Sequence, residues 1–377
     1  MGDSALRETP LASVHTSLNA SFTDFAGWNM PVRYGSDLAE HKAVRESAGI
    51  FDLSHMGEIH LRGPEAGAAL DYAFAGKLSN MAIGRAKYSL LLSPEGGVID
   101  DAIVYRLADE HFLVVANASN AEVDAREITE RAAKFDCEVD DASDRTALVA
   151  VQGPASADIV TRALTRDGSG AAGITAEDIA DLKYYRVLQG TFQGEDLTLA
   201  RTGYTGEDGF ELYVPNEKAV ALWELLVEVG GDALTPCGLA CRDTLRLEAG
   251  MPLYGHELGL DLKPAQAGMG RVVALAAKED FVGREATENT DTSDLPVLVG
   301  LTADGRRAAR AGAALRSTDG EEIGTVTSGA LSPTLGHPIA LAYVHPDHSA
   351  EGTELIIDVR GKDLPARVVA LPFYKRA

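Results

Sequence analysis

The chain has 377 residues, a length that exceeds one ordinary hydrophobic core and predicts two or three domains. Its formal net charge is −23, so its surface repels nucleic acid phosphates and anionic membranes, and we expect neither as a partner. No window offers the ~18 uninterrupted apolar residues that a membrane-spanning helix needs.

The composition also indicates the host and the cellular compartment. Only ten of the 34 basic residues are lysines, and the acidic residues are spread along the chain. This pattern favours an extremely halophilic host over an ordinary acidic cytosolic enzyme. The three cysteines, Cys137, Cys237 and Cys241, are too few for a disulfide framework and lack a second pair that would complete a metal site. The N-terminal stretch MGDSALRETPLASVH has no basic start followed by an apolar run, so we expect a cytoplasmic protein without a signal peptide.

The first third of the chain alternates between short helices and strands. Apolar spacing and composition predict helices at 37–48, 65–76 and 120–134, and strands at 51–61 and 86–92. The first of these strands ends in the turn Arg62-Gly63-Pro64. These elements indicate a compact α/β unit with antiparallel hairpins.

The stretch GGVIDDAIVYRL, residues 96–107, is the centre of this unit. Two glycines open a turn, two carboxylates, Asp100 and Asp101, follow, and a run of strand formers comes next. Because side chains alternate along a strand, the two acids point to opposite faces, and one of them can face a cavity. Tyr88 stands thirteen positions before Asp101, across the hairpin. Read alone, the stretch favours the alternative that both acids are turn residues.

The remainder of the chain predicts a second mixed unit and a small β domain. The strand at 147–152 and its Gly153-Pro154 turn repeat the pattern of the earlier Gly63-Pro64 turn. Further strands are expected at 181–189 and 196–202, helices at 218–229 and 238–249, and a linker with one short helix at 280–294. Short strands separated by Gly, Asp and Pro then predict a barrel or sandwich: 297–301, 322–327, 339–344, 354–359 and 366–371.

Four further stretches carry candidate binding residues. In RTGYTGEDGFE, residues 201–211, Tyr204 can present an aromatic face and Glu211 an anionic acceptor, although a plain glycine-rich turn is the alternative. Arg242 and Arg246 lie one helical turn apart and suit bidentate binding of a carboxylate, unless they pair with the chain's own acids. Met56 suits packing on a planar ring, with core filling as the commoner role. The C-terminal stretch LPFYKR adds an aromatic residue after the last strand.

Together these stretches resemble the T protein of the glycine cleavage system, an aminomethyltransferase family. The order and spacing of the motifs make the resemblance specific over nearly the whole chain. The motifs are DFAGWNMPVRY, DLSHMGEI, KYSLLL, GGVIDDAIVY, RTGYTGEDGFEL, the PCGL to YGHEL stretch, DFVGRE and GTVTSGALSPTLGHPIALAYV.

The resemblance implies an α+β fold, a three-domain cloverleaf of two α/β units and a C-terminal β-barrel around a central folate cavity. Its first domain, 1–51 plus 143–279, is interrupted by the second, 52–142, and the linker and barrel occupy 280–377. It implies transfer of an aminomethyl carbon from the lipoyl arm of the H protein to tetrahydrofolate, with release of ammonia and formation of 5,10-methylene-tetrahydrofolate. No metal is implied.

Matched residue by residue, Asp101 is the family's catalytic carboxylate at the pterin. The folate-pocket positions that the resemblance implies are Met56, Tyr88, Asn117, Tyr204, Glu211, Arg242 and Tyr374. Three positions depart from the family pattern, Gln266 where Glu is common, Arg271 where Trp is common, and Cys241 where a small residue is usual.

Two other functions fit the same fold. One is a folate-dependent demethylase that acts on a small methylated substrate without a lipoyl carrier. The other is a non-enzymatic folate-binding protein of iron–sulfur assembly, although its characteristic Lys-Gly-Cys-Tyr segment is absent from this sequence.

Overall fold

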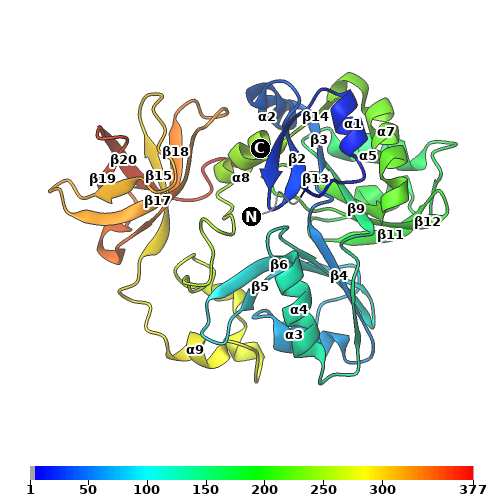
Figure 1. Ribbon diagram of the computed structural model, residues 1–377, viewed down its shortest axis with the longest axis horizontal. Coiled ribbons are helices and arrows are strands. Elements are labelled where there is room, and N and C mark those ends of the chain that lie inside the picture. Colours follow the sequence, from blue (N-terminus) through cyan, green and yellow to red (C-terminus); the bar gives the residue numbers. More distant parts are fainter. Residues whose placement is uncertain (1–4, 377) are drawn as a thin grey trace. The chain divides into compact units, whose positions relative to one another are not determined.

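A computed structural model describes residues 5–376, so the first four residues of the N-terminal stretch MGDSALRETPLASVH lie outside it. The chain divides into two compact units. Figure 1 labels the helices and strands that make them up. The first comprises the described part of Met1–Ala69 with Leu78–Lys87 and Ile103–Arg242. The second comprises Leu70–Lys77, Tyr88–Ala102 and the described part of Asp243–Ala377.

A seven-stranded sheet forms the core of the first unit. Its neighbouring strands run antiparallel except for the parallel pair β3–β14. In sheet order the strands are β10 (Ala171–Ala172), β11 (Val187–Phe192), β12 (Glu195–Ala200), β13 (Gly209–Pro215), β9 (Thr146–Gln152), β3 (Ala48–Asp52) and β14 (Leu234–Pro236). The interior strand β9 contains the apolar run 147–151, as expected for a strand that is buried on both faces.

Helices bury the apolar face of this sheet. Leu222, Trp223 and Leu226 of α7 and Ile159 of α5 join the sheet's core cluster, since apolar residues recur at helical spacing along both helices. The helices of this unit are α1 (Ala12–Ser17), α2 (Asp37–Glu46), α4 (Ala121–Ala132), α5 (Ser156–Thr165), α6 (Ala176–Asp181) and α7 (Ala219–Gly230), with the 3₁₀ turns Asn216–Lys218 and Gly231–Ala233. A separate hairpin joins β1 (Ser21–Phe25) to β2 (Trp28–Arg33).

A five-stranded sheet carries the stretch with the paired acids. In sheet order its strands are β5 (Ala86–Leu92), β6 (Val98–Ala108), β7 (His111–Ala116), β4 (Gly57–Arg62) and β8 (Glu138–Asp141). Helix α3 (Ala66–Ala73) follows β4 through Gly63, and α5 follows β9 through Gly153. The two glycines have φ of 134° and 129°, so the repeat expected from the sequence is confirmed in the local backbone.

The second unit ends in a closed six-stranded barrel with an apolar interior. Buried and exposed residues alternate along its strands, for example in β20, because one face of each strand lines the interior. The strands are β15 (Val297–Ala303), β18 (Pro338–Val344), β17 (Glu322–Leu331), β16 (Ala314–Arg316), β19 (Glu354–Asp358) and β20 (Asp363–Val369). Before the barrel come α8 (Leu239–Glu248), which begins in the first unit, α9 (Arg284–Asn289) and the 3₁₀ turns Gly270–Val272 and Leu275–Ala277; Pro346–His348 lies between barrel strands.

The α+β class and the C-terminal barrel are confirmed, and several local predictions need correction. The last strand spans 363–369 rather than 366–371, and 181–189 splits between the end of α6 and the start of β11. Strands β1, β2, β8, β10, β13, β14 and β16 were not predicted, and the predicted strand 51–61 splits between the end of β3 and β4. The alternative that both acids are turn residues is wrong, because both lie inside β6.

Backbone contacts within the second unit hold the start of β6. The Val98 N–H lies 3.1 Å from the carbonyl oxygen of Gly259 and 3.2 Å from that of Leu262. Gly97 allows this approach, because a Cβ added there would lie 1.8 Å from the carbonyl oxygen of Leu260. The second glycine of GGVIDD is therefore a close-approach position.

We expect Gly97→Ala to lower the free energy of unfolding by about 1–3 kcal/mol, because the new methyl group would meet backbone that cannot rotate away. Calorimetric unfolding measures the change. Gly270→Ala is the matched control, since the nearest atom to its added Cβ lies at 3.9 Å. Equal melting temperatures for the two variants would contradict the close approach.

Candidate functional site

Asp101 and Tyr88 form a hydrogen-bonded pair in the second unit. The Tyr88 hydroxyl donates to Oδ2 of Asp101 at 3.0 Å and lies 3.4 Å from the sulfur of Met269. Strands β5 and β6 bring the two residues together across the hairpin that the sequence predicts. The phenol holds the Asp101 carboxylate in one orientation.

The two adjacent acids have different surroundings. Asp100 is fully buried, whereas Asp101 is partly exposed. The alternation of side chains along β6 produces this difference, as expected from the sequence. Asp101 is therefore the acid that a bound molecule can reach.

Glu211 is buried in the first unit, where hydroxyl groups surround its carboxylate. Oε2 accepts a hydrogen bond from Thr202 at 2.5 Å, from Tyr105 at 3.3 Å and from Tyr213 at 3.5 Å. Burial, with the Glu211 charge as a further cause, raises the pKa of Tyr105, and burial also raises that of Tyr213, so both phenols remain donors. The network presents Glu211 as an oriented acceptor.

Arg242 lies over the ring of Tyr204, with its guanidinium carbon 4.9 Å from the ring centroid. Burial lowers the pKa of Arg242, while Glu211 and Tyr204 act in the opposite direction. Within the described residues the Arg242 side chain has no carboxylate at ion-pair distance. A partly buried guanidinium of this kind suits an anionic ligand.

The remaining predicted residues lie at the ends of elements. Met56 and Asn117, in the first unit, are partly buried and follow β3 and β7 respectively. Tyr374, in the second unit, follows β20, and its N–H donates to the carbonyl oxygen of Glu248 at 2.8 Å. The structure thus groups Tyr204 with Arg242 and Tyr88 with Asp101.

Arg246, considered beside Arg242 as a carboxylate ligand, is instead a structural residue. It is buried and donates to Glu257 at 3.0 Å, to Asp243 at 2.9 Å and to Ser328 at 2.8 Å. The alternative that it pairs with the chain's own acids is confirmed. Sequence spacing alone could not separate the two arginines.

The three departures from the family pattern have different surroundings. The side-chain amide of Gln266 donates to the carbonyl oxygen of Pro296 at 3.0 Å, a bond that an ionised Glu could not make. Arg271 is exposed in a 3₁₀ turn, and Cys241 is buried in α8. Gln266 thereby ties the loop before the barrel to the residue preceding β15.

Tyr105, Thr202 and Tyr213 were missed by the sequence analysis. The available signal was period-two alternation, which places Tyr105 on the same strand face as Asp101 and Tyr213 on that of Glu211.

Over residues 5–376, no cluster of three or more His, Cys, Asp or Glu side chains could hold a metal ion. No helix in the same range has the length and apolar content to span a membrane.

Comparison with protein families matches both parts of the chain. Residues 11–277 match the family described as the GCVT N-terminal domain, and residues 297–375 match the glycine cleavage T-protein C-terminal barrel domain. Together the two matches span most of the sequence.

Curated relatives and a solved structure agree with this match. The chain is 63% identical to an aminomethyltransferase of Cutibacterium acnes, with 99% of each chain covered, and 54% identical to one of Streptomyces coelicolor, with 100% of each covered. The crystal structure of glycine cleavage system aminomethyltransferase T from Bartonella henselae is similar with a TM-score of 0.89 at 37% identity, covering 98% of each chain.

Glu58, on β4, generates a pH-dependent prediction. It is fully buried, and neither carboxyl oxygen has a hydrogen-bond partner among the residues that the structure describes. Burial, with Asp141 and Glu211 as further causes, raises its pKa well above the usual value. The folded state therefore keeps a proton that the unfolded state releases above about pH 4.5. The free energy of unfolding falls as the pH rises from this value toward the raised pKa of the folded state.

We expect Glu58→Gln to become more stable relative to the parent as pH rises from 5 to 8, because the amide carries no ionisable proton. Melting temperatures at both pH values measure the effect. The exposed Glu217→Gln is the control and should show no such trend. A difference between Glu58→Gln and the parent that is independent of pH would show that Glu58 is ionised in the folded protein.

Proposed function

Because the chain belongs to the glycine cleavage T-protein family and is an aminomethyltransferase, we propose that its donor is the aminomethyl group on the lipoyl arm of the H protein and its acceptor is tetrahydrofolate. The observation on which the proposal chiefly rests is the Tyr88–Asp101 pair on the predicted hairpin. The demethylase and iron–sulfur assembly alternatives gain no support, since the relatives at 63% and 54% identity are aminomethyltransferases.

The proposed reaction balances without a redox partner. The C–S and C–N bonds of the aminomethyl group break, and its carbon forms bonds to two folate nitrogens. The two folate N–H protons go to the departing amine, which leaves as ammonia, and to the lipoyl sulfur, which remains as a thiol. The product is 5,10-methylene-tetrahydrofolate. A protein that performs this transfer must position the reactants and move protons.

Asp101 is the proposed proton acceptor. Its partial exposure leaves it accessible to a bound pterin, and the Tyr88 hydroxyl holds Oδ2. An oriented carboxylate can accept the proton of the attacking nitrogen and, through the same contact, fix the pterin's position. Tyr88 then acts as a positioning residue for Asp101.

The other candidate residues fit recognition of the folate. Glu211, held by three hydroxyl groups, suits a hydrogen bond from the pterin's amino edge. Arg242 lacks an internal carboxylate partner in the described chain and suits a folate carboxylate. Tyr204, Asn117 and Tyr374 would contribute ring and polar contacts, and Met56 would pack on the pterin.

The sequence and the family resemblance support three further proposals, on domain boundaries, cellular location and excluded partners. We propose the three domains 1–51 plus 143–279, 52–142 and 280–377, with the folate in a central cavity. A cytoplasmic location is supported by the sparse cysteines, and the net charge of −23 argues against nucleic acid and anionic membrane as partners.

We expect Asp101→Asn to lower kcat by about 100-fold or more with an unchanged melting temperature, because an amide cannot accept the proton. Asp100→Asn should instead lower the melting temperature, since Asp100 is fully buried, and its folded fraction should retain turnover. The assay uses the lipoylated carrier with its aminomethyl adduct and tetrahydrofolate. An inactive Asp100→Asn beside an active Asp101→Asn would reverse the assignment.

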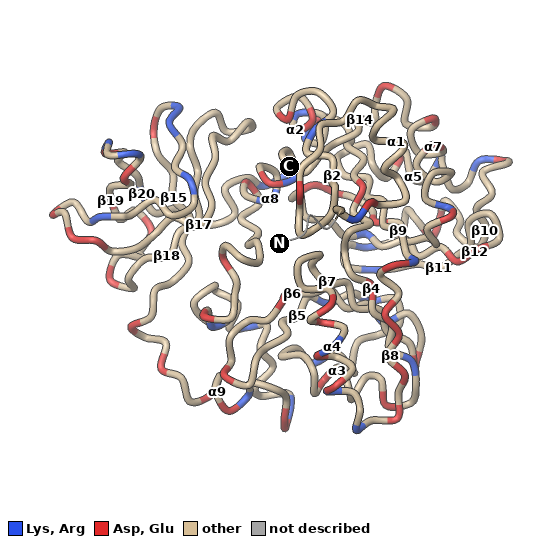
Figure 2. Tube along the Cα trace, viewed as in Figure 1, with Lys and Arg blue, Asp and Glu red and all other residues tan. Residues whose placement is uncertain are grey.

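The acidic surface supports a second proposal, adaptation to high salt. Acidic residues occur along the whole trace of the chain (Figure 2). At a net charge of −23, screening should relieve self-repulsion as the Debye length shrinks from ~10 Å at 0.1 M to ~3 Å at 1 M salt. We expect the melting temperature to rise between about 0.1 and 1 M KCl. A flat or falling melting temperature would contradict the halophile interpretation alone.

A further inference from the structure

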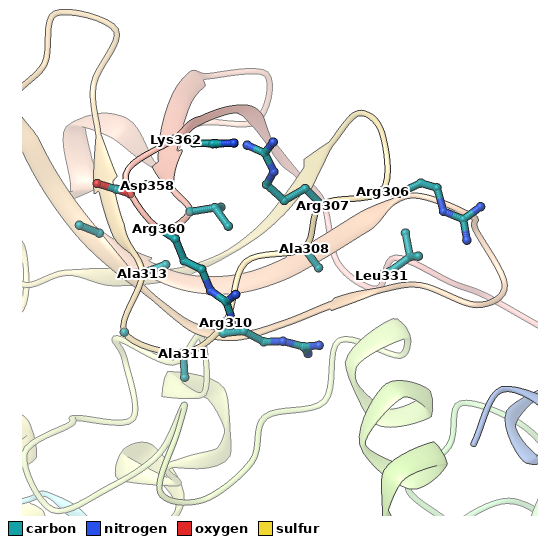
Figure 3. A pocket seen from close by; sticks show the side chains of 13 residues that line it. Arg306, Arg307, Ala308, Arg310, Ala311, Ala313, Leu331, Asp358, Arg360 and Lys362 are labelled. Carbon is teal, nitrogen blue, oxygen red and sulfur yellow. The ribbon is translucent and has the colours of Figure 1, made fainter. Parts of the chain in front are cut away.

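A basic cavity lies at one end of the barrel in the second unit. It has a volume of about 860 Å³ and is lined by residues 306–308 and 310–314, by Leu331, and by residues 358–360 and 362 of the following hairpin. Figure 3 shows three arginines from the first segment and Arg360 and Lys362 from the hairpin. The arginines of the first segment are Arg306, Arg307 and Arg310.

These cations are an exception in an acidic chain. The whole sequence has 57 acidic and 34 basic residues, yet the cavity lining has five basic residues and one acid, Asp358. Asp358 accepts a hydrogen bond from the Gly361 N–H at 2.6 Å. Among the described residues, four of the five cations have no ion-pair or hydrogen-bond partner for their side chains, and Arg310 donates to the Gly329 carbonyl oxygen at 3.0 Å.

The backbone of the hairpin is an independent observation. The loop between β19 and β20 has two central residues, Arg360 and Gly361, with φ of 56° and 74°. Paired backbone hydrogen bonds between Val359 and Lys362 close it, at 2.9 and 3.3 Å. Loops with two positive φ values favour Asn-Gly, so an arginine at the first position is locally unfavourable. The first central position of this turn therefore carries an arginine, although its backbone conformation favours asparagine.

The lining defines the ligand's chemistry. Between the cations lie small residues, Ala308 and the stretch 311–314, which leave room for a molecule. None of the described residues that line the cavity is aromatic, so a base or pterin has no stacking partner among them. Guanidinium groups match carboxylate and phosphate oxygens, and the volume lies in the range of small-molecule sites.

We propose that this cavity binds a small polyanion, a molecule that carries several carboxylate or phosphate groups. Its anionic groups would bridge the arginines of 306–310 and the cations of the hairpin. None of the residues that line the cavity is proposed for the transfer reaction, and the inference does not depend on that reaction.

Titration calorimetry of the full-length chain at about 10 mM ionic strength, where the Debye length is ~30 Å, tests the proposal. The probes are tripolyphosphate, the tricarboxylate tricarballylate, and inorganic phosphate as the single-group reference. We expect at least one of the first two to bind with a one-to-one stoichiometry and about tenfold tighter than inorganic phosphate. The tighter of the two identifies the anionic group that the site prefers.

Variants locate the binding. Arg360→Asn combined with Lys362→Gln should weaken binding of the preferred probe by about 3- to 30-fold. Arg360→Asn alone should weaken binding while the melting temperature stays equal or rises, because Asn suits the turn. A purely structural role for Arg360 would lower the melting temperature instead. Arg367→Gln is the control, since Arg367 pairs with Glu354 and does not line the cavity.

Three results would overturn the proposal. The first is that neither polyanion binds more tightly than inorganic phosphate. The second is that binding is unchanged in the double variant, which would place the anion elsewhere on the chain. The third is that Arg367→Gln weakens binding as much as the double variant, which would indicate a general charge effect.

Discussion

The site in the second unit depends on one close backbone contact. The absence of a side chain at Gly97 allows the start of β6 to lie against the carbonyl of Leu260, and the Val98 N–H reaches the neighbouring loop. This contact holds Val98, the first residue of β6, against the neighbouring loop. Side chains alternate along the strand from there, so that Asp100 lies in the interior and Asp101 remains accessible beside Tyr88.

In the first unit, hydroxyl groups hold a buried carboxylate, that of Glu211. Glu211 would be costly in the interior without donors, and Thr202, Tyr105 and Tyr213 provide them. A fixed acceptor and a guanidinium stacked on Tyr204 give this unit two polar groups oriented before any ligand arrives. In the second unit, Asp101 is likewise oriented by Tyr88. Preorganisation is thus common to both units.

Much of the fold could be predicted because several elements have strong local signals. The strand at 86–92 and the run at 147–152 are apolar and bounded by turn residues, and both were predicted at nearly their observed ends. β13 was missed because a charged residue, Glu211, interrupts its apolar pattern, and one of the donors that hold this carboxylate, Tyr105, is 106 positions away in the sequence. The basic cavity was also missed, since its two segments are about fifty residues apart and only the barrel's closure brings them to one end.

Tetrahydrofolate binding is the most direct test of the central claim that Glu211 and Arg242 recognise the folate. Titration calorimetry would compare the parent with the double variant Glu211→Ala, Arg242→Ala, with Glu217→Gln as an exposed control and unfolding curves for all three. The account predicts an affinity lower by at least about tenfold in the double variant and unchanged in the control, because charged hydrogen bonds contribute about 1.5–3 kcal/mol each. Undiminished affinity in a folded double variant would contradict it.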